Sequence, residues 1–174
     1  MIYLCGMRFL TGFAVTAVIF FLGFFLYITY WDEVIQPFFT DESTSVAIYV
    51  GDIPFSVKIA DTPESRYQGL SGTPPLRQFA GMLFIFNESA RHGFVMRDMN
   101  YAIDILWFDE DLLLVHVEEN ITPETYPKVF ASSLPARYVL EIAAGTVKSL
   151  KIVPGVALTL PAGVEPIRRT LDLQ

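Results

Sequence analysis

The start of the chain and the remainder follow two different hydrophobic patterns. Residues 9–30 read FLTGFAVTAVIFFLGFFLYITY and contain no charged side chain. A helix rises about 1.5 Å per residue, so this run would extend about 33 Å, enough to cross the hydrocarbon core of a bilayer. No polar face interrupts it, which disfavours a helix buried in a soluble core. We therefore expect a single N-terminal transmembrane helix.

The residues that flank this run predict its orientation. Arg8 precedes it, whereas Asp32 and Glu33 follow it. Because positive residues favour the cytoplasmic side, we expect the N-terminus in the cytoplasm and the C-terminal domain in the periplasm or outside the cell. A cleaved signal peptide is the alternative, but it would have a shorter apolar region and a small-residue cleavage site. The predicted location is the cell membrane, with a single pass.

Beyond the run, short β-type patterns alternate with turn residues. Residues 46–50 and 53–60 flank Gly51 and Asp52, a spacing that predicts a hairpin. Further strands are predicted at residues 82–86, 94–99, 103–108, 112–117, 137–142 and 156–160. Short helices are predicted at residues 63–68, after the capping residue Thr62, and at residues 144–150. This pattern predicts an all-β fold: a jelly-roll-like sandwich or barrel with one or two short helices.

Changes in composition predict the limits of the parts. Residues 1–31 form a cytoplasmic stub and the anchor, and the polar residues 32–45 form a stalk. Residues 46–160 form one β domain, and residues 161–174 form a C-terminal tail. Within the domain, residues 118–136 contain three prolines and form the longest irregular segment, a length that is often functional.

Charge and cysteine content exclude several functions. The formal net charge is −7 and no basic stripe is present, so we expect no nucleic-acid partner. The single cysteine, Cys5, lies in the N-terminal tail, so the domain has no disulfide and no cysteine zinc site. His92 and His116 lack the close spacing of a metal-binding pair. We expect neither a metal nor a cofactor.

One carboxylate stands on an apolar strand. Asp104 alternates with Ile103 and Ile105 and shares a face with Leu106 and Phe108. An unpaired carboxylate there would cost several kcal/mol, so Asp104 needs a partner. Three arginines could supply it, and Glu141 completes a candidate cluster for ligand binding or for a structural ion pair. The cluster comprises Asp104, Arg66, Arg97, Arg137 and Glu141.

Other catalytic patterns find little support. Ser71 lies in Gly-Leu-Ser-Gly, which is not the GxSxG elbow of a nucleophilic serine. Paired acids for glycoside cleavage could be drawn from Asp61, Asp104 and Glu141, but their separation cannot be read from the sequence.

Five short motifs together resemble a known family. They are Asp-Thr-Pro at residues 61–63 with Arg66 and Gly-Leu at residues 69–70, Gly-Met-Leu-Phe at residues 81–84, Phe-Val-Met-Arg-Asp-Met at residues 94–99, Ile-Asp-Ile at residues 103–105, and Arg-Tyr-Val-Leu-Glu at residues 137–141 with Ala-Gly at residues 144–145. In this order they resemble the DUF192 family, also called UPF0127, over about residues 53–160.

The resemblance implies an exported or membrane-anchored prokaryotic domain with a mainly β, jelly-roll-like fold and no established activity. Two features depart from the family pattern. The segment that resembles FWMKN has Val95 where the tryptophan is usual, and Val156 follows Gly155 where an aspartate is usual. If that aromatic residue lined a binding surface, the site would be altered in this chain.

Two functions follow from these observations. The first is a membrane-anchored, non-catalytic module outside the cytoplasm that binds a small ligand, a glycan or other envelope component, or an envelope protein. The alternative is an envelope hydrolase or carbohydrate-active enzyme that uses Asp104 and nearby arginines under the loop at residues 118–136.

Overall fold

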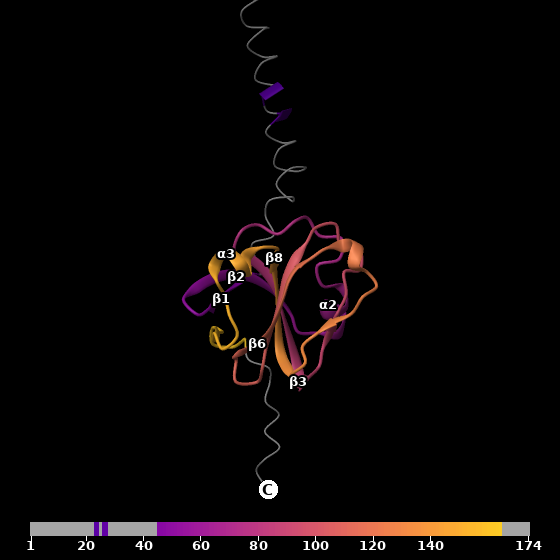
Figure 1. Ribbon diagram of the computed structural model, residues 1–174. Coiled ribbons are helices and arrows are strands. Elements are labelled where there is room, and N and C mark those ends of the chain that lie inside the picture. Colours follow the sequence, from indigo (N-terminus) through magenta and orange to yellow (C-terminus); the bar gives the residue numbers. More distant parts are fainter. Residues whose placement is uncertain (1–22, 25, 28–44, 165–174) are drawn as a thin grey trace, which may run out of the picture. The chain divides into compact units, whose positions relative to one another are not determined.

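The structure, a computed structural model, describes residues 23–24, 26–27 and 45–164 (Figure 1). The chain divides into two compact units, Met1–Ser43 and Thr44–Gln174. Most of the predicted transmembrane run, nearly all of the stalk and most of the C-terminal tail lie outside the described residues. Residues 23, 24, 26 and 27 are helical, and no helix within the described residues is long and apolar enough to span a bilayer.

Most of the second unit is one curled β-sheet. Its strands are β1 (Ser45–Val50), β2 (Ile53–Ala60), β3 (Ala80–Ala90), β5 (Ile103–Phe108), β6 (Leu114–Ile121), β8 (Ala136–Ala143) and β9 (Leu158–Thr159). They lie in the order β6-β5-β8-β3-β2-β1-β9. A separate two-stranded ribbon pairs β4 (Gly93–Phe94) with β7 (Phe130–Ala131).

The large sheet forms a half-barrel whose two edges approach each other. Leu113, just before β6, forms an isolated bridge with Ala157, just before β9. Only β2 and β3 pair in parallel, and the other neighbours are antiparallel. The predicted mainly β class is therefore confirmed, with the strands arranged as one curled sheet and a ribbon.

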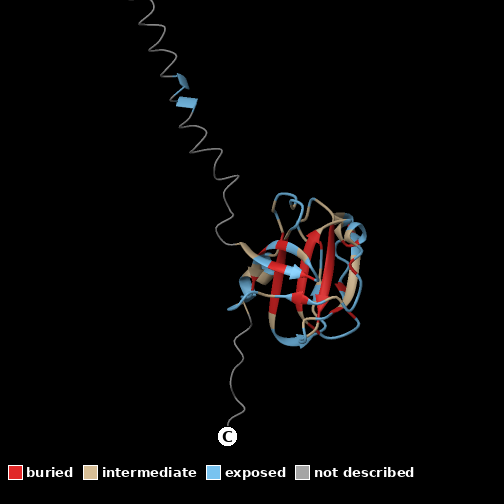
Figure 2. Ribbon diagram, turned by 90° about the vertical axis from the view of Figure 1, so that its left-hand side faces the viewer, coloured by how far each residue is buried: buried red, intermediate tan, exposed pale blue. Residues whose placement is uncertain are grey.

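Side chains alternate between the two faces of the sheet, and each face has its own core. Figure 2 shows that the strands of the sheet are mostly buried. The inner core lies on the concave face and consists of Ile48, Val50, Phe55, Val57, Leu83, Ile85, Leu106, Phe108, Leu114, Tyr138, Leu140, Ile142, Val147, Ile152 and Leu158. The outer core consists of Ala60, Leu70, Met82, Phe84, Met96, Ile103, Ile105, Trp107, Ile121, Phe130, Ala136 and Val139. The alternation predicted for residues 103–108 is confirmed, and all six residues are buried because both faces are covered.

Two short α-helices accompany the sheet on opposite sides (Figure 1). Helix α2 (Pro63–Gln68) has the predicted bounds: Thr62 caps it in a capping box with Ser65, and Gly69 ends it at φ 51°. Helix α3 (Thr146–Leu150) contributes Val147 to the inner core. A 3-10 turn, η3 (Pro123–Thr125), follows β6.

Two predicted segments differ from the structure by more than shifted ends. The strand predicted at residues 94–99 is wrong, because only Gly93–Phe94 pairs and Arg97 and Asp98 form a turn, with Asp98 at φ 53°. The irregular segment predicted at residues 118–136 is partly structured, since β6 extends to Ile121 and β7 lies within it. In both segments, the pairing partner decided which residues became strand.

Candidate functional site

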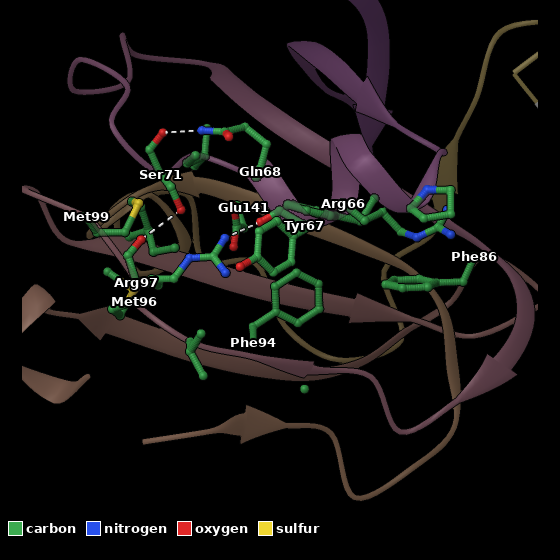
Figure 3. A pocket seen from close by; sticks show the side chains of 17 residues that line it. Arg66, Tyr67, Gln68, Ser71, Phe86, Phe94, Met96, Arg97, Met99 and Glu141 are labelled. Carbon is green, nitrogen blue, oxygen red and sulfur yellow. Dashed lines mark hydrogen bonds between the residues drawn. The ribbon is translucent and has the colours of Figure 1, made fainter. Parts of the chain in front are cut away.

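A pocket of about 340 Å³ opens on the outer face of the sheet (Figure 3). One wall comes from α2 and the loop after it, and the other comes from residues 93–99, whereas β3, β5 and β8 supply its base. It is lined by Pro63, Arg66, Tyr67, Gln68, Gly69, Leu70, Ser71, Phe84, Phe86, Gly93, Phe94, Val95, Met96, Arg97, Met99, Ile103 and Glu141. We call it the Glu141 pocket.

Glu141 is the only acidic residue that lines this pocket. It lies on β8 between Met82 of β3 and Ile105 of β5, so its side chain leaves the centre of the outer face. It is 6% exposed, and its Oε2 is buried without a hydrogen-bond partner. Burial raises the pKa of the Glu141 carboxyl to about 8, which makes it mostly neutral at pH 7.

Aromatic rings form most of the apolar wall. Phe94 meets Phe84 edge to face, with ring centroids 4.9 Å apart, and also packs at right angles against Phe86 and against the buried Trp107. Met96 is buried beside them. These interlocked rings give the pocket a rigid apolar surface around a single carboxyl group.

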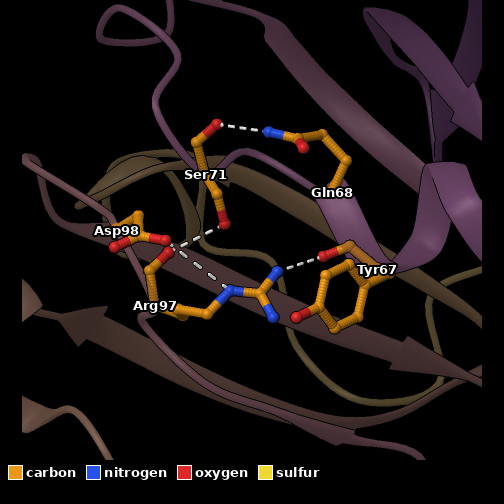
Figure 4. A network of polar contacts seen from close by, with 5 residues as sticks. All are labelled: Tyr67, Gln68, Ser71, Arg97 and Asp98. Carbon is orange, nitrogen blue, oxygen red and sulfur yellow. Dashed lines mark hydrogen bonds and ion pairs between the residues drawn. The ribbon is translucent and has the colours of Figure 1, made fainter.

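Arg97 and Tyr67 connect the two walls at the rim. The Arg97 guanidinium lies 3.9 Å from the centroid of the Tyr67 ring, and its Nη2 donates to the Tyr67 carbonyl (Figure 4). Its Nε is 3.8 Å from Asp98 Oδ2, and Ser71 Oγ donates to the Arg97 carbonyl. Gln68 in turn donates to the Ser71 carbonyl. These contacts hold α2, its following loop and residues 97–98 together.

A second, more polar hollow of about 290 Å³ lies beside the first. It shares Tyr67, Gln68, Ser71 and Arg97 with the Glu141 pocket, and Gly72 and Asp98 complete its lining. The Arg97–Tyr67 contact therefore lies between an apolar hollow and a polar one.

Arg66 lies against Phe86 at the other end of the pocket. Its Nη1 donates to the carbonyls of Asp61 and Ile85, and its guanidinium is 5.2 Å from the Phe86 ring centroid. His92 stacks on the same ring, with centroids 3.5 Å apart. Burial lowers the pKa of the His92 imidazole, its bond to the Glu88 carbonyl opposes this, and the Arg66 charge lowers it further.

The predicted pairing of Asp104 with an arginine is wrong. Asp104 is fully buried on the inner face, where its Oδ1 accepts from the backbone N–H groups of Asn120, at 2.8 Å, and Gly145, at 3.1 Å. Its Oδ2 accepts from the N–H of Val147 at 2.9 Å. The sequence pointed to side-chain partners, but the start of α3 and the left-handed residue Asn120 supply backbone donors instead.

The predicted cluster is therefore divided. Arg66, Arg97 and Glu141 line one pocket, whereas Asp104 lies on the opposite face of the sheet and Arg137 is absent from the lining. Arg137 instead donates from Nε to the Phe86 carbonyl at 3.3 Å. No residue of the predicted loop at 118–136 lines the pocket.

Sequence reasoning missed the aromatic wall and the role of Tyr67. The motif at residues 94–99 could have indicated the wall, because Phe94, Met96, Arg97 and Met99 all line the pocket. Val95 lies where the FWMKN-like segment of the family usually has a tryptophan, and it lines the pocket as well. One of the two departures from the family pattern therefore falls at the pocket.

The two histidines contact aromatic rings rather than each other. His116 lies beside Trp107, at 5.3 Å between centroids, and its Nε2 is 3.3 Å from Glu118 Oε1. Among the described residues, no three His, Cys, Asp or Glu side chains gather in a way that could hold a metal ion.

Comparisons with solved structures place this fold among known ones. A candidate transcription regulator from Sinorhizobium meliloti is 30% identical, with a TM-score of 0.61, over 67% of this chain and 92% of that chain. A protein of unknown function from Novosphingobium aromaticivorans is 25% identical, with a TM-score of 0.62, over 66% of this chain and 84% of that chain. No curated protein matches the chain.

The family model of DUF192, described as an uncharacterised ACR, matches residues 46–160. This range includes all the strands except for Ser45, the first residue of β1. It also includes all 17 residues that line the Glu141 pocket. The chain belongs to the DUF192 family.

Proposed function

We infer that the domain is a binding module for a small molecule and that the Glu141 pocket is its site. The buried, unpartnered carboxyl of Glu141 carries this inference. A polar group in such a place costs free energy unless it forms a hydrogen bond, and structures keep few of them without a reason. A ligand in the pocket would supply the missing partner.

The surroundings of Glu141 support the same function. Small-molecule sites are typically concave and mostly apolar, with a few polar groups that orient the ligand. The Glu141 pocket has aromatic and methionine walls, one buried carboxyl and two arginines. A carboxyl with a raised pKa in a cleft is also a common sign of a functional site.

A membrane tether completes the proposal. The uncharged run at residues 9–30, with Arg8 before it and Asp32 after it, supports a single span. In this arrangement the N-terminus is cytoplasmic, and the domain faces the periplasm or the exterior.

The alternative functions receive less support. An enzyme that uses Asp104 lacks an accessible carboxylate, because three backbone N–H groups already bind it on the inner face. The description of the Sinorhizobium meliloti protein as a transcription regulator is not extended to this chain, because the net charge of −7 opposes binding to phosphate backbones.

Glu141→Met tests the binding function. Fragments of all charge types are screened by saturation-transfer NMR against the full-length chain in lipid nanodiscs, with empty nanodiscs as the blank. We expect fragments that bind the wild type and weaken at least tenfold in Glu141→Met. The free energy of unfolding of the variant should also be about 1 to 3 kcal/mol higher than that of the wild type, because the substitution removes an unpartnered polar group.

Glu110→Met is the matched control, since Glu110 is exposed in a turn and is not among the residues that line the pocket. It should keep both the fragment binding and the stability of the wild type. Fragments that bind Glu141→Met as well as they bind the wild type would contradict the proposed site, and so would the absence of any bound fragment.

A further inference from the structure

The pocket differs in charge from the rest of the molecule. The chain as a whole carries −7, yet the pocket lining holds two arginines and a single carboxyl group. Because that carboxyl is mostly neutral at pH 7, the lining as a whole is positive. A positive hollow in an acidic protein favours a ligand that carries negative charge.

Arg97 is placed to meet such a charge. Its Nη2 is occupied by the Tyr67 carbonyl and its Nε faces Asp98, but its Nη1 has no hydrogen-bond partner among the described residues. The side chain of Arg97 is 28% exposed and lines both hollows. A planar guanidinium fits a carboxylate well.

Arg66 is less available. Its Nη1 already donates to two backbone carbonyls and its plane lies near Phe86. We therefore assign the charged end of the ligand to Arg97.

Glu141 occupies the inner end of the pocket, and in Figure 3 it lies behind the Arg97–Tyr67 contact. The charged or titratable groups around it are Arg66 on α2, Arg97 on the facing loop, and Tyr101. Burial raises the pKa of the Tyr101 phenol, its bond to Thr73 opposes this, and the Glu141 charge raises it further. No ion pair holds Glu141 in the described structure. A protonated Glu141 carboxyl could therefore donate a hydrogen bond to a ligand in the pocket.

The walls between these two groups are apolar. Phe84, Phe94 and Met96 offer ring faces and a thioether rather than hydrogen bonds. They favour an aromatic or aliphatic body over a polyhydroxylated one, because each sugar hydroxyl would lose its water without a replacement.

On this basis, and resting on the proposed binding function, we propose that the pocket binds a small organic anion. Its carboxylate contacts Arg97 at the rim, its apolar body lies against Phe84 and Phe94, and a hydrogen-bond acceptor at its inner end meets Glu141.

Three aromatic probes that differ in charge test this ligand class on the full-length chain in nanodiscs. They are 4-acetylbenzoate, an anion with a carbonyl at its far end, its neutral analogue 4-acetylbenzamide, and the cation benzylamine. At pH 7 we expect 4-acetylbenzoate to bind at least tenfold more tightly than either of the others. This comparison needs no variant.

Two variants then assign the contacts. Arg97→Gln should remove the preference for the anion over the amide, whereas Arg91→Gln, at an exposed residue outside the pocket lining, should retain it. For Glu141, the measurement is the ratio of affinities at pH 7 and pH 9. The wild type should weaken about tenfold as its carboxyl ionises, and Glu141→Gln, which does not titrate, should change less than twofold.

The outcomes separate this proposal from the binding function. If benzylamine or the amide binds best and depends on Glu141, the pocket is a binding site but the ligand class is wrong. If the anion binds best and Arg97→Gln leaves its preference intact, the assignment to Arg97 is overturned. If no probe and no library fragment binds the wild type, the binding function fails together with the ligand class.

Discussion

Two buried acidic residues on neighbouring strands have opposite environments. Asp104 accepts hydrogen bonds from three backbone N–H groups, whereas Glu141 Oε2 has none. The difference follows from which face each residue occupies: the inner face meets the start of α3, and the outer face opens into the pocket. A saturated carboxylate stabilises the fold, while an unpartnered one destabilises it.

The pKa of Glu141 predicts how stability changes with pH. Below its ordinary value of 4.5, the carboxyl is protonated in both states; between 4.5 and about 8, only the unfolded chain releases the proton. Stability contributed by this group therefore falls as pH rises through that window. Relative to that of Glu141→Gln, the free energy of unfolding of the wild type should fall by on the order of a few kcal/mol between pH 4.5 and 8.

Urea unfolding of both proteins at several pH values measures this difference. Taking the difference between the two cancels the other titrating groups. Parallel stability curves would show that folding does not raise the pKa of Glu141, contrary to the burial of this carboxyl in the structure.

At the scale of elements, Asp104 joins three parts of the chain. Its carboxylate on β5 binds the N–H of Asn120 in β6 and two N–H groups at the start of α3. A helix of five residues has little stability of its own, so this contact and the burial of Val147 hold it against the sheet. The N-terminal N–H groups of α3 would otherwise be buried without acceptors.

Asp104→Asn should therefore destabilise the domain by about 2 to 4 kcal/mol, because an amide replaces one acceptor oxygen with a donor. Asp52→Asn, in the exposed turn between β1 and β2, is the control and should change the stability by less than about 0.5 kcal/mol. Urea unfolding measures both variants. Unchanged stability with lost fragment binding would return Asp104 to the ligand site.

At the scale of the whole molecule, the curled sheet separates a closed core from an open site. The concave face collects side chains from all seven strands, so it can form a core without the outer face. Within the described residues, the outer face is covered by α2, loops and a short ribbon, and this thinner cover leaves room for the pocket. Loops carried on a rigid sheet are a common position for binding sites.

The proposed membrane topology makes a prediction of its own. Cys5, the single cysteine, precedes the uncharged run and should be protected from a membrane-impermeant thiol reagent in spheroplasts. A cysteine introduced by Ser133→Cys in a Cys5→Ser background, at an exposed position of the domain, should be labelled. Detergent lysis should expose both cysteines. Labelling of Cys5 before lysis, with protection of the introduced cysteine, would indicate the opposite orientation in the membrane.

Features with a local cause could be predicted from the sequence. The bounds of α2 follow from Thr62, Pro63 and Gly69, which begin and end a helix whatever its surroundings. The β1–β2 hairpin follows from two adjacent turn residues, and the two faces of β5 follow from alternation. Family membership likewise follows from short motifs in a fixed order.

Features that depend on residues distant in the chain could not be predicted from the sequence. Residues 94–99 have the composition of a strand, but only Gly93–Phe94 finds a pairing partner, in β7. Likewise, the sequence showed that Asp104 needs a partner, but no local pattern reveals which backbone N–H groups a later helix will bring to it.

The sequence by itself determined the class of fold, the family, the uncharged N-terminal run and three residues of the candidate site: Arg66, Arg97 and Glu141. Only the tertiary structure decided that these three share one pocket while Asp104 lies behind the sheet. The physical reason is that composition and periodicity act over a few residues, whereas a pocket depends on which strands pair and which face each one presents.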